Sequence, residues 1–483
     1  MVYTNPVRVR FAPSPTGYLH IGGLRTALFN YLFARHNSGK LVLRIEDTDQ
    51  SRKVEGAVEN LIHTLNTVGI DYDEGPDIGG EYGPYFQSQR LDIYRKYAEE
   101  LLEKGYAYYA FETTEELEEM RRIQQMQGLQ TMYNRRGRDL GNKEVNEKLK
   151  KNIPYVIRLK IPLNTEIKFN DMIRGTVKFD TNLIDDQVLI KSDGYPTYHL
   201  ANVIDDHLMK ITHVIRGEEW LTSVPKHIIL YDAFGWEIPE LAHVPLILNP
   251  DKTKLSKRQG DVATEDFLNK GYLPEALLNF IALLGWNPGE GEKREIFSKE
   301  EFIKLFSIDK VNSSGAVFNK DKLDWMNVEY IKKYDFEKLL ELANPYLHKA
   351  GYDVSDANKT KRVVYALKTY INKLDEIPEK AEIYYNKNIS LSVEQKSFLN
   401  LETSRKVVSL LNYKLKSILE ITIDNFKPLV NEIQKETGIK GKNLFQPIRL
   451  ALTGEDHGPE LGLIAYVLGK EEVMNRLNIL NVH

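Results

Sequence analysis

The first 50 residues constrain the fold most, because they predict one complete βαβ unit. Residues 7–11 alternate as a strand does, and residues 41–45 predict a second strand. Between them, apolar residues recur at helical spacing from Gly22 onward, and residues 37–39 end the helix. Two parallel strands joined by a helix need a right-handed crossover, as in doubly wound sheets. We therefore expect a Rossmann-type parallel sheet in an α/β domain.

The strand and helix pattern changes twice along the 483 residues, which are too many for one compact core. Between about residues 88 and 185 it gives way to a charged helix at 114–126, an arginine-rich loop and short strand-like pieces. We interpret this stretch as an inserted α+β domain. Strand candidates return at 213–215 and 244–248. After about residue 325 the pattern predicts an all-helical region, with helix candidates at 363–374, 407–419 and 461–468.

Composition excludes several classes of protein. The chain has no cysteine, so disulfides, a cysteine-ligated zinc and a thiol nucleophile are ruled out. The net charge of −4 argues weakly against a dedicated nucleic-acid coat, yet it permits an enzyme with a local basic face. No apolar run approaches the roughly 18–20 residues that span a bilayer. The N-terminus shows no export signal, so we expect no membrane contact and a cytoplasmic location.

Polar residues follow each of the four best strand candidates. In an open parallel sheet, ligands bind in the crevice outside the carboxyl ends of the strands. Charges at one strand end are often only surface charges, but four such groups together predict one ligand site. The four groups are residues 10–17, the pair Glu46 and Asp47, the trio Arg216, Glu218 and Glu219, and residues 249–258.

Two of these loops suit phosphate chemistry. The first is stiffened by prolines and leads through His20 to Gly22 and Gly23, where helix N–H groups can attract phosphate. A histidine in this place is more often a helix cap, although it can also donate to a phosphate oxygen. The second loop carries Ser256 between Lys254 and Lys257. A lysine cluster is usually a solvated surface, but one that follows an apolar strand suits closure over a pyrophosphate.

Six strings of the sequence resemble bacterial glutamyl-tRNA synthetases, a family of class I aminoacyl-tRNA synthetases. FAPSPTGYLHIGG at 11–23 resembles the HIGH signature in its glutamyl form, and KLSKR at 254–258 resembles the KMSKS signature. GKNLFQPIRLALTG at 441–454 resembles the helical anticodon-binding part. The other strings are RIEDTD at 44–49, YPTYHLAN at 195–202 and IRGEEWL at 215–221.

The resemblance implies a role for each matching residue. His20, Lys254 and Lys257 would be catalytic, and a local basic face in the C-terminal region would bind tRNA. ATP would be bound by His20, Gly22, Gly23, Glu219, Trp220, Lys254, Ser256 and Lys257. Glutamate would be bound by Arg10, Ala12, Ser14, Glu46, Tyr198, Asn202 and Arg216, with Glu46 on the α-amino group. The residues of this face are indicated by their charge and not by the resemblance: Lys440, Lys442 and Arg449 flank an apolar helical segment, and the net-acidic chain needs a local basic face.

The resemblance also implies substrates, partners and domains. ATP would arrive with Mg²⁺, L-glutamate would be activated to an adenylate once tRNA(Glu) is bound, and the enzyme would be a monomer. Gly23 stands where the signature usually ends in histidine. Residues 106–111 offer aromatic side chains and no cysteine, so we expect no structural zinc and no other metal site. The domains would be a Rossmann catalytic domain in two halves (1–87 and 186–250), an inserted tRNA acceptor-binding domain (88–185), a KMSKS loop and stem-contact domain (251–325) and a helical anticodon-binding region (326–483).

Several alternatives stay open. A glutaminyl-tRNA synthetase would share the catalytic domain but carry a β-barrel C-terminal region, so the helical patterns and the cation of Arg216 favour glutamate. A truncated relative acting on a modified tRNA base would lack the region after about residue 300. A catalytically dead RNA-binding module could lose His20, Lys254 and Lys257, yet all three are present. The sequence does not show whether tRNA(Gln) is also charged, nor which residues read the anticodon.

Overall fold

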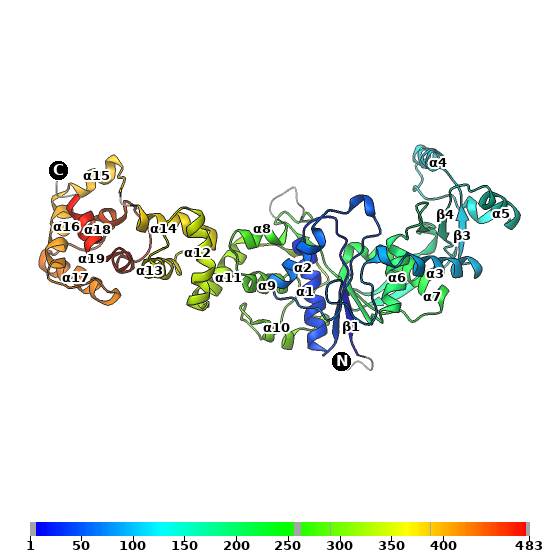
Figure 1. The fold of residues 1–483 in the computed structure, drawn as a ribbon, viewed down its shortest axis with the longest axis horizontal. Coiled ribbons are helices and arrows are strands. Elements are labelled where there is room, and N and C mark those ends of the chain that lie inside the picture. Colours follow the sequence, from blue (N-terminus) through cyan, green and yellow to red (C-terminus); the bar gives the residue numbers. More distant parts are fainter. Residues whose placement is uncertain (1–5, 256–261, 290, 387, 480–483) are drawn as a thin grey trace. The chain divides into compact units, whose positions relative to one another are not determined.

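The computed structural model describes residues 6–255, 262–289, 291–386 and 388–479, and the chain forms two compact units (Figure 1). Unit 1 comprises Met1–Asp266 and Leu278–Asn319. Unit 2 comprises Phe267–Leu277 and Lys320–His483. No helix in the described part of the chain is both long and apolar enough to cross a membrane.

Unit 1 is built on the predicted βαβ unit. Strands β1 (Arg8–Phe11) and β2 (Lys40–Leu43) pair in parallel, and α1 (Ile21–His36) connects them. The apolar residues of α1 are buried because the helix packs against β1, β2 and β8 as well as α10 (Lys299–Leu305). The α/β prediction for the N-terminal region is confirmed.

The parallel sheet continues beyond β1. Strands β8 (His213–Gly217) and β9 (Glu240–Val244) pair in parallel, and the Thr212 N–H donates to the Arg8 carbonyl over 2.9 Å, so β8 lies beside β1. The hairpin of β5 (Glu166–Asp171) and β6 (Gly175–Asp180) joins the edge of β9. This hairpin belongs to the stretch that the sequence predicts as an insertion, yet it extends the main sheet.

One predicted strand is divided in two. The sequence predicts a strand over 244–248, but β9 ends at Val244 and β10 (Ile247–Leu248) pairs instead with β11 (Ala316–Val317). Pro245 explains the break, because it lacks the N–H that a central strand needs.

The inserted stretch also contains a sheet of its own. Its strands β3 and β4 are antiparallel, and β4 also pairs antiparallel with β7, which follows the stretch predicted as inserted. The charged helix predicted at 114–126 is confirmed as α4. A capping box between Thr113 and Glu116 starts α4 at that position. The elements of unit 1 not yet given are β3 (Ala107–Ala110), β4 (Val156–Leu159), β7 (Val188–Ile190), α2 (Ala57–Thr67), α3 (Leu91–Glu103), α4 (Thr114–Met126), α5 (Asn142–Lys150), α6 (Tyr198–Leu208) and α7 (Val224–Phe234).

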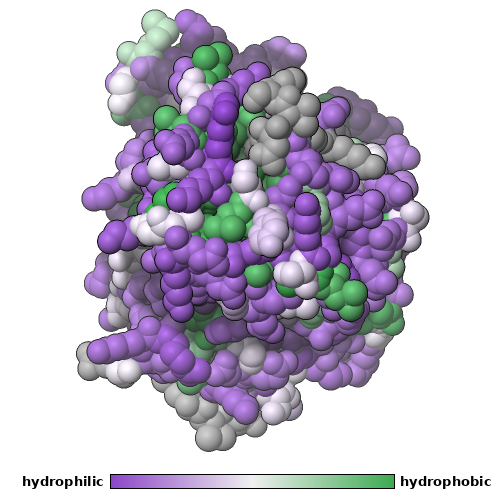
Figure 2. Space-filling model, turned by 90° about the vertical axis from the view of Figure 1, so that its left-hand side faces the viewer, coloured by the Kyte–Doolittle hydropathy of each residue, from purple (hydrophilic) through white to green (hydrophobic). Residues whose placement is uncertain are grey.

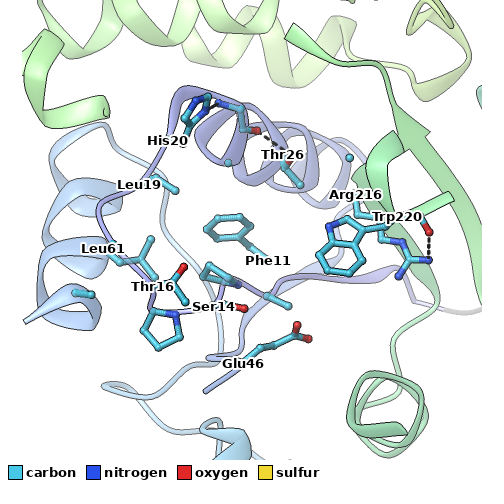
Figure 3. Close-up of a pocket in the computed structure, with 18 of the residues that line it drawn as sticks. Phe11, Ser14, Thr16, Leu19, His20, Thr26, Glu46, Leu61, Arg216 and Trp220 are labelled. Carbon is cyan, nitrogen blue, oxygen red and sulfur yellow. Dashed lines mark hydrogen bonds between the residues drawn. The ribbon is translucent and has the colours of Figure 1, made fainter. Parts of the chain in front are cut away.

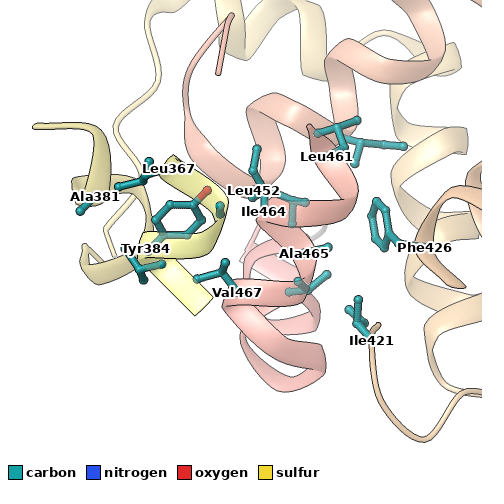
Figure 4. Close-up of a cluster of buried hydrophobic side chains, with 14 of the residues drawn as sticks. Leu367, Ala381, Tyr384, Ile421, Phe426, Leu452, Leu461, Ile464, Ala465 and Val467 are labelled. Atoms are coloured by element: carbon teal, nitrogen blue, oxygen red, sulfur yellow. The ribbon is translucent and has the colours of Figure 1, made fainter. Parts of the chain in front are cut away.

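Unit 2 contains only helices among its described residues, which confirms the helical prediction. Its core is one apolar cluster, and Figure 4 shows Ile464 and Val467 between Tyr384 on one side and Phe426 on the other. The helices after residue 320 are α11 (Lys320–Lys333), α12 (Phe336–Lys349), α13 (Ala357–Leu367), α14 (Ile377–Tyr385), α15 (Val393–Leu399), α16 (Glu402–Leu415), α17 (Ile423–Thr437), α18 (Lys442–Thr453) and α19 (Leu461–Ile479). Two further helices, α8 (Thr264–Asn269) and α9 (Pro274–Ala282), precede them.

Candidate active site

A cavity of about 460 Å³ opens at the carboxyl ends of β1 and β8, where a doubly wound sheet places its ligand. Figure 3 shows His20 at one side of this cavity, Glu46 at the opposite side, and Arg216 with Trp220 at a third. Most predicted site residues of the catalytic domain lie in its wall, although their roles stay predictions. These residues are Arg10, Ala12, Ser14, His20, Gly22, Gly23, Glu46, Tyr198, Asn202, Arg216, Glu219 and Trp220.

The described part of the lysine loop, up to Leu255, does not line this cavity. Lys254 is exposed and is not among the residues that line the cavity. Residues 249–255 turn back beside β10, because the Asn249 N–H donates to the Thr253 carbonyl (2.8 Å) and the Leu255 N–H to the Ile247 carbonyl (3.0 Å). Ser256 and Lys257 lie outside the described residues. Three of the four predicted groups have residues in the wall of the cavity, and part of the fourth, residues 256–258, lies outside the described residues.

His20 caps the helix that it precedes. Its Nδ1 accepts the Gly22 N–H over 2.9 Å, so the neutral ring carries its proton on Nε2. The Ile21 N–H is also occupied, since it donates to the Val262 carbonyl over 2.9 Å. His20 therefore occupies the Gly22 N–H in this structure, and the role of Gly22 in binding ATP stays a prediction. The cap and the phosphate-donor roles of His20 are compatible, because they use different ring nitrogens.

Glu46 lies at the edge of a buried network of charges. Its Oε1 accepts hydrogen bonds from Arg44 Nη2 (3.1 Å) and Asn202 Nδ2 (3.2 Å). Asp206 in turn accepts from Arg44 Nη1 (2.8 Å) and Arg10 Nε (3.1 Å). Burial raises the pKa of Glu46, and the attraction of Arg44 and Arg10 offsets this only in part. A ligand cation beside Glu46 would therefore be favourable.

Arg216 presents its guanidinium to the cavity without a carboxylate partner. Its Nε donates to His243 Nε2 (3.1 Å), its Nη1 to the Tyr198 hydroxyl (2.6 Å) and its Nη2 to the Trp220 carbonyl (3.4 Å). In the described ranges, no acidic side chain lies within ion-pair distance of it. Glu218, an acid two residues further along the chain, accepts instead from Arg174 and from the Leu246 N–H.

Sequence alone missed the residues that support this wall. Arg44, Asp206 and His243 are buried and act through partners more than 25 residues away, apart from the local contact of Arg44 with Glu46. One signal was visible: two adjacent acids, Asp205 and Asp206, directly follow the apolar pair Val203 and Ile204 in α6. Buried carboxylates need cations, so such a pair points to arginines nearby.

The arginine-rich loop at 134–138 serves the protein's own structure. Arg135 and Arg138 both bind the carboxylate of Asp186, which is fully buried. At the 106–111 stretch, Tyr109 and Phe111 pack with Tyr155 at ring-centroid distances of 5.0 and 6.1 Å. Throughout the described ranges, no group of three or more His, Asp or Glu side chains could hold a metal ion.

The predicted tRNA-binding residues differ in exposure. Lys440 and Lys442 are exposed, whereas Arg449 is half-buried, and burial lowers its pKa. The face drawn in Figure 2 is largely hydrophilic, with hydrophobic side chains in small separate patches. Arg449 is thus a weaker candidate for a phosphate contact than the two lysines.

Comparison with known proteins agrees with this architecture. Residues 6–325 match the family model of the catalytic domain of class I tRNA synthetases (E and Q), and residues 338–480 match an anticodon binding domain. The glutamate–tRNA ligase of Clostridioides difficile (strain 630) is 50% identical over 98% of each chain, and that of Alkaliphilus metalliredigens (strain QYMF) is 48% identical over 99% of each. A crystal structure of a glutamate tRNA ligase from Elizabethkingia meningosepticum CCUG26117, in complex with its amino acid, is similar with a TM-score of 0.90, at 39% identity over 99% of both chains.

Proposed function

This chain belongs to the class I tRNA synthetases of the glutamate and glutamine branch, and we propose that it attaches L-glutamate to tRNA(Glu) at the expense of ATP. The observation that carries the amino-acid assignment is Arg216, a buried cation in the cavity wall whose charge no acidic side chain of the described residues neutralises. A side-chain carboxylate of the substrate would neutralise the charge of Arg216. The relatives reported above are named for glutamate, which leaves the glutaminyl alternative without support.

The substrate is charged at three places, and the cavity wall offers a matching group for two of them. Glu46 faces the α-ammonium group, since burial disfavours its negative charge and Arg44 and Arg10 offset this only in part. Arg216 binds the side-chain carboxylate through one N–H on each terminal nitrogen. Of its five N–H groups, His243, Tyr198 and Trp220 take three, so two remain for a bidentate contact.

The reaction proceeds in two displacements. The α-carboxylate of glutamate attacks the α-phosphorus of ATP, which arrives with Mg²⁺, and pyrophosphate leaves. A hydroxyl of the terminal adenosine of tRNA then attacks the activated carbonyl, and AMP leaves. The chain contributes positioning and electrostatics, with no covalent nucleophile. In this proposal His20 donates its Nε2–H to a phosphate oxygen, Lys254 and Lys257 stabilise the leaving group, and tRNA binds before glutamate is activated.

Aminoacylation tests the proposal directly. The purified chain is assayed with ATP, Mg²⁺ and either tRNA(Glu) or tRNA(Gln), each with labelled glutamate and labelled glutamine. We expect glutamate on tRNA(Glu), and the tRNA(Gln) arm determines whether the enzyme is discriminating. Transfer of glutamine in preference to glutamate would overturn the assignment.

A further inference from the structure

Three buried polar side chains form a chain of hydrogen bonds across three neighbouring strands. Asp171 lies on β5, His243 on β9 and Arg216 on β8, and their exposed fractions are 3%, 0% and 5%. His243 Nδ1 lies 2.6 Å from Asp171 Oδ2, and Arg216 Nε donates to His243 Nε2 over 3.1 Å. Arg216 and His243 are direct neighbours in the parallel register. Arg216 lines the cavity, whereas the other two lie behind it.

The contacts fix the state of the histidine. A guanidinium Nε–H can only donate, so His243 Nε2 must accept and the ring must be neutral with its proton on Nδ1. That proton is donated to Asp171. Burial lowers the pKa of His243, and the hydrogen bond to Asp171 opposes this only in part, so the neutral form prevails at pH 7. Asp171 thereby selects the tautomer that Arg216 requires.

We propose that His243 and Asp171 are positioning residues for glutamate recognition: they hold the Arg216 guanidinium so that its terminal nitrogens face the substrate carboxylate. Arginine has four rotatable side-chain bonds, and a bidentate contact requires one plane and one direction. The acceptor at Nε2 sets that plane from behind, while the Tyr198 hydroxyl sets it from the side. The inference rests on the proposed function, since it needs a carboxylate at Arg216.

His243 is the better place for a test than Asp171. The Oδ1 atom of Asp171 also accepts the N–H groups of Ile173 and Arg174, each at 3.0 Å, so a change there would disturb the turn after β5. Two substitutions at His243 separate the roles of its nitrogens. His243→Gln places an amide group where Nε2 lies and can accept from Arg216. His243→Asn is polar as well, but its amide reaches only the place of Nδ1.

The readout is the split between KM and kcat in glutamate activation with tRNA(Glu) present. A side-chain contact that is equally strong in ground and transition states affects KM and leaves kcat unchanged. We expect His243→Asn and His243→Leu to raise the KM for glutamate roughly 10- to 100-fold, the scale for a hydrogen bond to a charged group. His243→Gln should recover most of this loss, and the KM for ATP should change by less than about twofold in all three.

A double variant shows whether His243 acts through Arg216. In an Arg216→Ala background, His243→Leu should raise the KM for glutamate no further, because the group that it positions is gone. His213→Gln is the matched control. His213 is a buried histidine on the same sheet that packs against Phe33 with ring centroids 4.9 Å apart, and it does not line the cavity. Its substitution should leave the KM for glutamate unchanged.

Three outcomes would overturn the inference. They are an unchanged KM for glutamate in His243→Asn, an equal rise of this KM in the Gln and Asn variants, or a further rise when His243→Leu is added to Arg216→Ala. If His243→Leu does not fold, the Gln and Asn pair still decides. A failure of the proposed function itself is distinct, because the wild-type chain would then not activate glutamate at all.

Discussion

In our proposal, the preference for glutamate over glutamine depends on one side chain, that of Arg216. Glutamine would offer Arg216 an amide, and the guanidinium would keep an uncompensated charge in the wall of the cavity. Truncating one side of such a buried pair costs roughly 2–5 kcal/mol. We therefore expect Arg216→Ala to raise the KM for glutamate steeply and to shrink the preference for glutamate, measured as the ratio of kcat/KM for the two amino acids.

Arg216→Lys is the companion variant. It keeps the charge but loses the fork, so it should restore only part of the activity. Equal weakening of both amino acids by Arg216→Ala, or a change in thermal stability alone, would show that the arginine is structural.

Lys257 carries a second prediction at this scale, which rests on the sequence because the residue lies outside the described ranges. Lys257→Ala should lower the turnover of tRNA-dependent ATP–pyrophosphate exchange by roughly 10²-fold or more, the scale for one lost electrostatic donor. The KM for glutamate should barely change, since the lysine would act on the pyrophosphate. Exchange near the wild-type rate would identify the loop as a solvated surface.

At the residue scale, the sequence predicted the wall of the site better than its support. Local strings such as residues 11–23 place their side chains in the cavity because a short loop and a helix start determine where those side chains lie. The contacts of Asp206 and His243 are made instead with arginines that are distant in the sequence: Arg10 is 196 residues from Asp206, and Arg216 is 27 residues from His243. No local pattern specifies such pairs, so they became visible only in the folded chain.

At the scale of elements, Asp206 connects α6 to the ends of β1 and β2. It accepts from Arg10 and Arg44, and its side chain is 1% exposed. Removing one partner of a buried ion pair costs roughly 3–5 kcal/mol. We expect Asp206→Asn to lower the free energy of unfolding of unit 1 by this order at pH 7. Tryptophan fluorescence in urea suits the measurement, because Trp220, Trp236 and Trp286 lie in unit 1 and only Trp325 lies in unit 2.

The effect of Asp206→Asn should depend on pH in one direction. Burial opposes the charge of Asp206, but the attraction of Arg10 and Arg44 outweighs it and lowers the pKa of this carboxyl. A depressed pKa stabilises the fold above the unfolded-state value of about 3.9, and this contribution is lost as the pH falls through the folded-state pKa. The difference in the free energy of unfolding between wild type and Asp206→Asn should therefore be complete at pH 7 and disappear as the pH falls below about 4. Asp92→Asn, at a side chain that is 99% exposed, is the control and should show no gap.

The elements themselves were predictable where one pattern acted alone. The βαβ unit and the capped helix α4 follow from alternation, helical spacing and a capping box. The prediction of one strand over 244–248 was wrong, because Pro245 ends β9 within a run of residues that are otherwise apolar. The helix expected over 363–374 ends as α13 at Leu367, and a separate short turn begins at Leu374.

At the scale of the whole molecule, the division into units does not follow the chain. Phe267–Leu277 belongs to unit 2, where the Leu273 N–H donates to Asn327 Oδ1 over 2.8 Å and the Leu374 N–H donates to the Gly271 carbonyl over 3.1 Å. The sequence predicts that this stretch belongs to the 251–325 domain. The apolar residues of its helices predict that they are buried, but not which of the two hydrophobic cores they join. Truncating the chain near residue 325 to test tRNA binding would remove Asn327, the hydrogen-bond acceptor of the Leu273 N–H. Charge substitutions in the full chain are therefore a better test of tRNA binding.

The last prediction concerns how the net-acidic chain binds a polyanion. Lys440 and Lys442 are exposed and, among the described residues of unit 2, have no carboxylate partner, so their charges remain available for phosphates. Each neutralised phosphate contributes about −0.7 to −0.9 to the slope of log K against log salt concentration. Replacing both lysines by glutamine should therefore weaken tRNA(Glu) binding and make that slope shallower by about 1 to 2, as measured by filter binding from low to high salt. The KM for ATP should stay unchanged.

Lys414→Gln is the matched control for this pair. Lys414 Nζ already binds Glu432 (3.0 Å) and Glu436, so its charge is neutralised within unit 2 and should contribute nothing to the salt slope. If the double variant keeps the wild-type slope, phosphates are neutralised elsewhere on the chain and the 440–442 segment is not part of the tRNA-binding face. If Lys414→Gln makes the slope shallower by as much as the double variant does, exposure and the lack of a carboxylate partner do not determine which lysines contact the tRNA. Lys440 and Lys442 would then have no advantage over other lysines as candidates.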